Sequence, residues 1–312
     1  MKISWLVAAV LFVDIVSADD AEPSIQGGDL LAAFELNQAS LESFDVLVIK
    51  KEVTIDAQDK ISEKEVRQRI RCDLENDRLL SVILGSETHG HDKKRSRYGS
   101  CLIADGKNIR HDIDLYRKKS IPLRSPSSLK YCFLTQFVPE IRTIGLADFP
   151  DSITYGSPND WREEFVIHKA KKKSLVKITS DNRAEISSVL DNPRFYYVLT
   201  FDLARNLIIH RELNQIVRSP KDEKLKKLFM FEESIKWTEI NGVFVPAALH
   251  YLRLTPMARK KMDSNQRQVT FTWLAVNDEF DDDAFDVSAA ESYERLEKLV
   301  SLENVKRQTQ DD

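Results

Sequence analysis

Alternation of apolar and polar side chains is the feature that most restricts how this chain can fold. The segments FYYVLTFDL (195–203) and QRQVTFTWLAV (266–276) place an apolar residue at every second position. A period of two residues is typical of a β-strand that buries one face. Short turn sequences stand between such segments, among them Asn241-Gly242, a two-residue hairpin signal. We therefore expect consecutive antiparallel strands, each joined to the next by a tight turn.

The first half of the chain continues this pattern. In VRQRIRCDL (66–74), four apolar residues alternate with three arginines and one aspartate. This predicts a strand with one buried face and one strongly charged face. Asp105-Gly106 marks another hairpin. Five prolines interrupt residues 111–159, so we expect loops there around a single strand at 129–138.

A helix is expected at each end of the strand-rich region. After Asp29, apolar residues recur at helical spacing in LLAAFELNQASLES (30–43). Near the C-terminus, Ser288 and Glu291 have the spacing of a capping box, and an apolar stripe follows them as far as Val300.

These elements predict an α+β fold built on one large curved antiparallel β-sheet, a half-barrel of about ten strands. Each strand has one apolar face, so the sheet must cover a single face. We expect the N-terminal and C-terminal helices to pack on its concave side. Two stacked antiparallel sheets are the alternative architecture.

The N-terminus has the features of a cleavable secretory signal peptide. Lys2 precedes an apolar run from Ile3 to Val16, and small residues lead to a cleavage position near Ala18. A membrane anchor is the competing interpretation, but the run is shorter than the roughly 20 residues that span a bilayer. We therefore expect an exported protein, periplasmic or extracellular, that is soluble after cleavage.

The expected organisation is a single domain flanked by short segments. It comprises a signal peptide (1–18), a short tether (19–28), one β-rich domain (29–305) and a polar tail (306–312).

Charge and cysteine content narrow the classes of function. Acidic residues outnumber basic ones by 50 to 46, which argues against bulk binding of nucleic acid. Cys72, Cys101 and Cys132 are spaced without a CxxC motif, so a zinc or redox motif is not supported. We expect buried strand cysteines with at most one disulfide, and an odd thiol left over.

Three motifs in the second half resemble a known family. They are the aspartate that ends a strand in LTFDLARNLII (Asp202), the turn and strand NGVFVP (241–246), and the closing segment WLAVNDEFDDDAF (273–285). Over residues 195–285 the chain resembles the LolA-like half-barrels of lipoprotein-sorting and lipid-carrier proteins. It is also similar in layout to bacterial exported proteins of unknown function. The resemblance implies a curved sheet with an apolar concave face able to hold an acyl chain.

The aromatic residues of the expected strands are the candidate ligand-binding lining. They would form either an apolar cavity wall or ordinary core. The candidates are Phe195, Tyr197, Phe201, Phe229, Phe231, Trp237, Phe271 and Trp273.

Metal and catalytic motifs are weaker. His89 and His91 are two residues apart and could share an ion, but the basic segment after them favours a solvated hairpin loop. The acidic run 278–283 lacks the ligand spacing of an EF-hand loop and is expected to be a charged surface loop. The basic stretch 169–173 is expected to be a solvated turn, although it could touch anionic lipid headgroups.

Four further histidines, His111, His168, His210 and His250, lie on separate elements, none in a recognisable nucleophile motif. We expect no catalytic residues and no cofactor.

Three functional hypotheses follow. The first is a non-catalytic exported protein that holds a lipid, an acyl chain or a lipidated partner on the concave face of the sheet, with peripheral membrane contact possible. The second is a periplasmic sensor or protein-interaction module. The third is a hydrolase whose histidine meets a carboxylate and a hydroxyl only after folding.

Overall fold

The fold is seen in a computed structural model. The structure describes residues 27–56, 58–89, 94–105, 109–113, 120–122, 141, 144, 175–179, 182–189, 195–218, 225–256, 262–285 and 297–301. The expected signal peptide, most of the tether, the expected strand at 129–138 and the polar tail lie outside these residues. Within them, no helix is long and apolar enough to cross a membrane.

Thirteen strands occur in the described residues. Those of the first half are β1 (Ser43–Ile55), β2 (Ile61–Asp73), β3 (Arg78–His89), β4 (Lys94–Asp105), β5 (Ile109–Ile113) and β6 (Ser120–Pro122). Those of the second half are β7 (Leu175–Thr179), β8 (Arg183–Val189), β9 (Phe195–Asp202), β10 (Leu207–Arg218), β11 (Leu225–Ile240), β12 (Val243–Pro256) and β13 (Met262–Val276).

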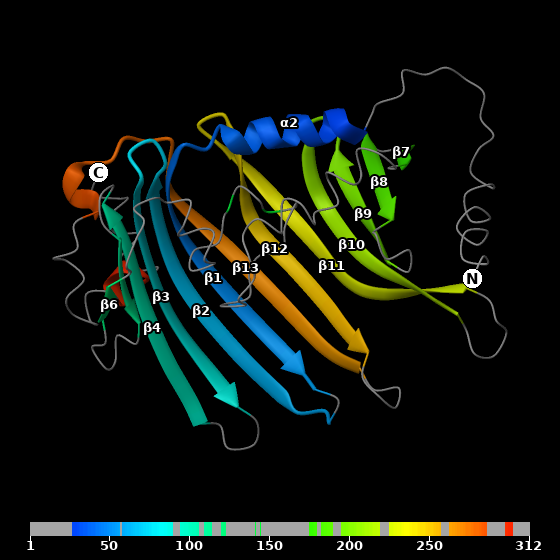
Figure 1. The fold of residues 1–312 in the computed structure, drawn as a ribbon, viewed down its shortest axis with the longest axis horizontal. Coiled ribbons are helices and arrows are strands. Elements are labelled where there is room, and N and C mark those ends of the chain that lie inside the picture. Colours follow the sequence, from blue (N-terminus) through cyan, green and yellow to red (C-terminus); the bar gives the residue numbers. More distant parts are fainter. Residues whose placement is uncertain are drawn as a thin grey trace.

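All thirteen strands belong to one antiparallel sheet, so the alternative of two stacked sheets is wrong. The order is β6-β5-β4-β3-β2-β1-β13-β12-β11-β10-β9-β8-β7, and the long strands curve together across the molecule (Figure 1). The sheet is open, with β6 and β7 at its edges. It is wider than the expected ten strands partly because two strands were missed. β6 has only three residues, and β8 (RAEISSV) has too few apolar residues to show alternation.

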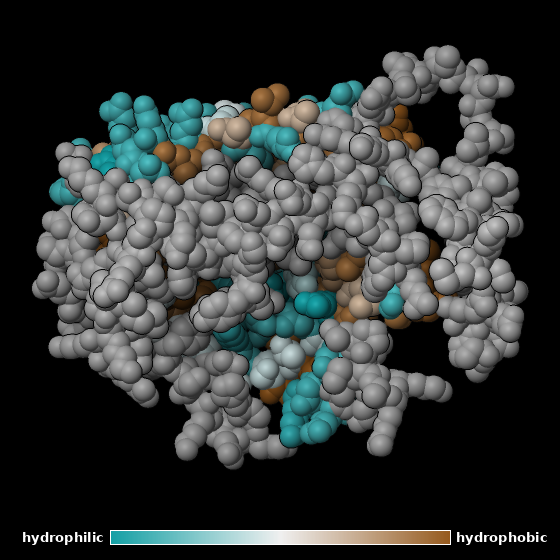
Figure 2. All heavy atoms as spheres, viewed as in Figure 1, coloured by the Kyte–Doolittle hydropathy of each residue, from teal (hydrophilic) through white to brown (hydrophobic). Residues whose placement is uncertain are grey.

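Helix α2 (Gly27–Ala39) confirms the expected N-terminal helix and lies across the ends of β9–β12 (Figure 1). Its residues Leu30, Leu31 and Phe34 are buried in one cluster with side chains of the sheet, including Phe44 and Val46. We call this side of the sheet the helix face. Apolar side chains of α2 are also visible at the outer surface among polar ones (Figure 2), and Leu36 is 73% exposed.

The C-terminal segment covers the opposite face of the sheet, which corrects the expectation that both terminal helices share one side. The 3-10 helix η4 (Asp282–Phe285) brings Phe285 into a second buried cluster with Leu47 and Val300. Leu47 alternates along β1 with Val46, which belongs to the helix-face cluster. Most of the helix expected from Ser288 lies outside the described residues.

The charged face expected for β2 is largely covered toward the end of the strand, although Arg67 is exposed. Arg69 and Arg71 both bind the carboxylate of Asp45, with the closest N–O distances at 2.8 and 2.7 Å. The same two guanidinium groups donate to the main-chain carbonyls of Leu299 and Ala284. The arginines therefore anchor the C-terminal segment to the sheet, a role that the strand's own sequence did not indicate.

The expected turns are confirmed at Asn241-Gly242 and after Asp202, whereas Gly106 of the expected Asp105-Gly106 hairpin lies outside the described residues. Asn241 and Gly242 both have positive φ angles (50° and 77°), as the two central residues of a type I′ turn require. Asp202 ends β9 and accepts a hydrogen bond from the N–H of Ala204 at 3.0 Å. Asn206, at φ 56°, completes that turn.

Asn277 joins β1 and β13, the first and last of the described strands along the chain, which are neighbours in the middle of the sheet. It follows β13 at φ 55°, and its Oδ1 accepts hydrogen bonds from the N–H groups of Glu42 (2.8 Å) and Ser43 (3.3 Å). Its Nδ2 donates to the carbonyl of Ser40 at 2.7 Å. The side chain thus ties the start of β1 to the end of β13.

We predict that Asn277→Ala lowers the free energy of unfolding by about 2 kcal/mol, because three hydrogen bonds are lost and alanine disfavours a positive φ. Asn277→Gly loses the same bonds without the backbone penalty, so it should unfold between the alanine variant and the wild type. Urea unfolding followed by circular dichroism measures both. Equal midpoints for the alanine variant and the wild type would contradict the role of Asn277.

Candidate functional site

The candidate aromatic residues are distributed unevenly over the structure. Phe201, Phe231 and Phe271 are buried, whereas Trp237 and Trp273 are partly buried against the helix-face cluster. Phe229 is partly exposed, opposite Asn214, where the β10–β11 register shifts by one residue. The side chains of Phe195 and Tyr197 lie outside the described part of the structure.

The two tryptophans are held by the strands themselves. The indole N–H of Trp237 donates to the carbonyl of Ile208 at 2.8 Å, and that of Trp273 donates to the carbonyl of Pro246 at 2.7 Å. Trp237 also meets the ring of Phe34 from α2 edge-on, with centroids 5.8 Å apart. Both rings therefore keep a fixed polar anchor on the sheet, while α2 contributes only apolar contact to Trp237.

Beyond this apolar region, the helix face carries a row of charged and aromatic residues that are directly opposite one another on neighbouring strands. We call it the charged row, and it consists of Arg211 (β10), Glu233 (β11), Tyr251 (β12), Arg267 (β13), Glu52 (β1) and Lys64 (β2). Positive and negative side chains alternate along it, apart from Tyr251.

The charged row is buried, apart from Glu52 and Lys64, which are partly buried, and it contains two ion pairs. Arg211 binds Glu233 at 3.1 Å with both side chains almost fully buried, and Arg267 lies 3.6 Å from Glu52. Tyr251 sits between these pairs, 4.9 Å beneath the guanidinium of Arg267. Opposite charges directly across an antiparallel ladder stabilise the register, so the row favours one alignment of the six adjacent strands from β10 to β2.

Phe231 extends the stacking toward Arg211. Its ring stacks on that of Tyr251 with centroids 5.5 Å apart, and the Arg211 guanidinium lies 5.0 Å from its centroid. Phe231 was a candidate for an apolar lining, yet the structure places it against the buried guanidinium of Arg211 and the ring of Tyr251. Desolvated cations over aromatic faces gain on the order of 2 kcal/mol.

Lys50 adjoins the charged row on β1. Burial, helped by the neighbouring charge of Arg267, lowers the pKa of Lys50 to about 7, although Glu52 at 3.4 Å opposes the shift. Burial alone would raise the pKa of Glu52, but the hydrogen bond from Asn265 and the cations nearby hold it below its usual value. Glu52 is therefore ionised near neutral pH, while Lys50 changes its charge there.

The helix face thus combines an apolar region near α2 with a buried charged row beside it. Sequence reasoning found the apolar side chains from the alternation but missed the row. The sequence does contain a signal for the row. Some positions that the alternation assigns to the apolar face of a strand hold a charged residue instead, such as Glu52 after Val48 and Arg267 before Val269. It becomes meaningful only when the strand register is known.

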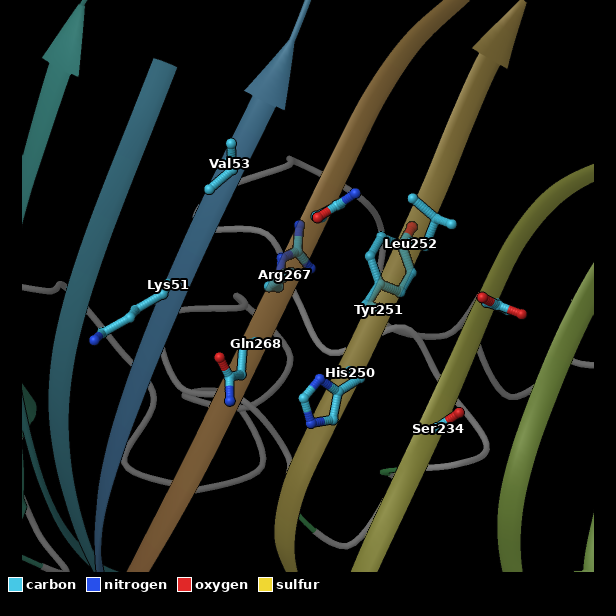
Figure 3. Close-up of a pocket in the computed structure, with 10 residues that line it drawn as sticks. Lys51, Val53, Ser234, His250, Tyr251, Leu252, Arg267 and Gln268 are labelled. Atoms are coloured by element: carbon cyan, nitrogen blue, oxygen red, sulfur yellow. The ribbon is translucent and has the colours of Figure 1, made fainter. Parts of the chain in front are cut away.

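The opposite face brings two of the expected histidines together. His210, Ser234 and His250 are directly opposite one another on β10, β11 and β12. Next to them lies a groove of about 430 Å³, lined mainly by polar side chains from four strands (Figure 3). The side chains of His89 and His111, and residues His91 and His168, lie outside the described part of the structure, as does the basic stretch 169–173.

The remaining motifs have structural roles where they are described. The Asp278 carboxylate accepts a hydrogen bond from the N–H of Val276, and the Asp278 carbonyl accepts one from the Ser43 hydroxyl, so the acidic run begins by capping β13. Cys72 and Cys101 are buried in different clusters on opposite faces of the sheet, which rules out a disulfide between them. Cys132 lies outside the described residues.

We predict that Lys50 makes stability depend on pH. Its pKa is lower in the folded chain than in the unfolded chain, so unfolding takes up a proton between about pH 7 and 10.5 and stability rises with pH in that window. Within this window the unfolding free energy of the wild type, minus that of Lys50→Met, should rise by about 1 kcal/mol per pH unit. Urea titrations at several pH values measure this.

Lys51→Met is the matched control for this experiment. Lys51 is exposed on the opposite face, so its removal should leave the pH dependence of the wild type in place. A wild-type minus Lys50→Met difference that stays constant with pH would show that Lys50 does not titrate in this way.

Three solved structures resemble this chain weakly, with low sequence identity and low TM-scores. A DUF1329 family protein from Desulfovibrio piger has 9% identity and a TM-score of 0.40, and the match covers 84% of this chain and 97% of the chain of that protein. A LolA superfamily protein from Nitrosomonas europaea has 10% identity and a TM-score of 0.38, covering 85% and 99%. A putative outer membrane lipoprotein-sorting protein domain from Vibrio parahaemolyticus has 9% identity and a TM-score of 0.37, covering 84% and 98%.

The expected resemblance to LolA-like proteins is thus confirmed, as a weak one. No family model and no curated protein matches the chain.

Proposed function

We propose that this chain is an exported, non-catalytic binding protein that holds an acyl chain, or the acyl chain of a lipidated partner, on the helix face of its sheet. Export is inferred from the signal-like residues 1–18. The observation that carries the binding proposal is the pair of partly buried tryptophans, whose N–H groups are satisfied by strand carbonyls. Neither of these hydrogen bonds involves α2.

The geometry of α2 supports a cover that can give way to a ligand. A helix of 13 residues is about 20 Å long, whereas thirteen strands span roughly 60 Å. The hydrogen bonds between α2 and the sheet join Asn37, near its C-terminal end, to the main chain of Phe244 at 3.3 and 3.4 Å. Apart from Gln38, the buried side chains of α2 are apolar (Leu30, Leu31 and Phe34), and an acyl chain would replace their contacts with contacts of the same kind.

The charged row sets the depth of the proposed site. Buried charges exclude an acyl chain, because removing their partners or water is costly. The apolar part of a ligand would therefore lie between α2 and Val269, the helix-face residue of β13 that is next to Arg267 on the side nearer α2. A lipid headgroup would be oriented toward the charged row.

We predict that the chain from Asp19 onward binds cis-parinaric acid, a fluorescent acyl chain, and that Phe34→Ala raises the affinity roughly tenfold. Phe34 docks α2 on the surface that the ligand would use, so loosening the helix removes a competitor. Fluorescence titration, with excitation transferred from tryptophan, measures the affinity.

Phe285→Ala makes the same chemical change on the opposite face and should leave the affinity at the wild-type value when compared at equal folded fraction. Lipids extracted from the exported protein and identified by mass spectrometry provide a second readout. The proposal fails if the wild type neither binds the probe nor carries extractable lipid.

A further inference from the structure

Three side chains with metal-ligand chemistry meet on the opposite face of the sheet, away from the proposed acyl site. His210 and Glu212 lie two residues apart on β10, and Glu232 is directly opposite Glu212 on β11. One ligand atom from each residue lies within 4.8 Å of the others, and the side chains are partly buried. The His210 Nε2 is 3.6 Å from Glu212 Oε1.

We propose that His210, Glu212 and Glu232 bind a divalent transition-metal ion of the zinc class. Zinc holds imidazole nitrogen and carboxylate oxygen at about 2.1 Å, which places two ligands of a tetrahedral ion about 3.4 Å apart. The Nε2–Oε1 distance is already close to this value. An imidazole ligand favours zinc over calcium or magnesium, which prefer oxygen alone.

The surrounding contacts orient the ligands as a metal would need them. The His210 Nδ1 lies 3.2 Å from the Ser234 hydroxyl, so a proton on Nδ1 leaves the Nε2 lone pair directed at the ion. Asn214 and Lys227 each donate to Glu212 Oε2 at 3.0 Å, which leaves Oε1 for coordination.

Asn214 provides a second, independent indication of a ligand. It is fully buried, and its Oδ1 has no hydrogen-bond donor within the part of the chain that the structure describes. A buried carbonyl oxygen without a donor costs about 1–3 kcal/mol. Water bound to an ion at Glu212, beside which Asn214 lies, would supply that donor.

The groove on this face borders the proposed ion. Glu232 and Ser234 line it together with His250 and Gln268 on the next two strands (Figure 3). With three protein ligands, a tetrahedral ion keeps one position for water or another small ligand. That position would open at the edge of the groove.

The same contacts do not form a hydrolytic triad. Ser234, His210 and Glu212 have the right chemical types, but 3.6 Å between His210 and Glu212 is too long for the hydrogen bond that holds such a histidine. The main-chain N–H groups of this part of β11 serve the ladders on both sides, which leaves none for an oxyanion hole.

Isothermal titration calorimetry of the untagged chain from Asp19 onward with Zn²⁺ tests the proposal. We expect His210→Ala and Glu232→Gln each to weaken one zinc site at least tenfold, whereas His250→Ala, an exposed histidine beside the site, leaves it unchanged. Circular dichroism confirms equal folding. A zinc affinity that survives His210→Ala, or that falls equally in His250→Ala, overturns the proposal, as does an absence of binding in the wild type.

The proposed ion does not depend on the acyl site, and the two tests fail separately. Phe34→Ala should leave zinc binding unchanged, because α2 lies on the other face of the sheet.

Discussion

The pairing of β1 with β13 is the interaction on which the rest of the structure depends. Strands β1–β6 and β7–β13 form two meanders, and within the described sheet the two join only where β1 meets β13. Every residue of β1 from Phe44 to Ile55 has a partner on β13. Without this ladder each meander would expose a long unpaired edge, and the helix face would be divided in two.

The same strand explains why both faces of the sheet are covered. Phe44, Val46 and Val48 enter the helix-face cluster, while Asp45 and Leu47 are buried beneath the C-terminal segment. A slip of one residue would exchange these two sets. The Asp45 carboxylate would then lose Arg69 and Arg71, and breaking a buried ion pair costs about 3–5 kcal/mol. Charge and packing therefore select one register.

The sequence allowed the strands, the turns and the first helix to be predicted, because each depends on neighbouring residues. Alternation located most of β9–β13, and Asn241-Gly242 located their tightest turn. The charged row was missed because Glu52 and Arg267 are far apart in the chain and meet only through the β1–β13 register. The side taken by the C-terminal segment depends likewise on long-range bonds from β2 to residue Leu299.

Consecutive residues of β10 and β11 point to opposite faces of the sheet, so the two strands place a different set of side chains on each face. Arg211 and Glu233 point to the helix face and form a buried pair, while Glu212 and Glu232 point to the opposite face. Because the buried pair fixes how these strands align, it also fixes the spacing of the two carboxylates. Two acidic groups held close together repel each other, and a bound cation relieves that repulsion. The ion pair that stabilises one face thus creates, on the other, the arrangement that a metal ion would complete.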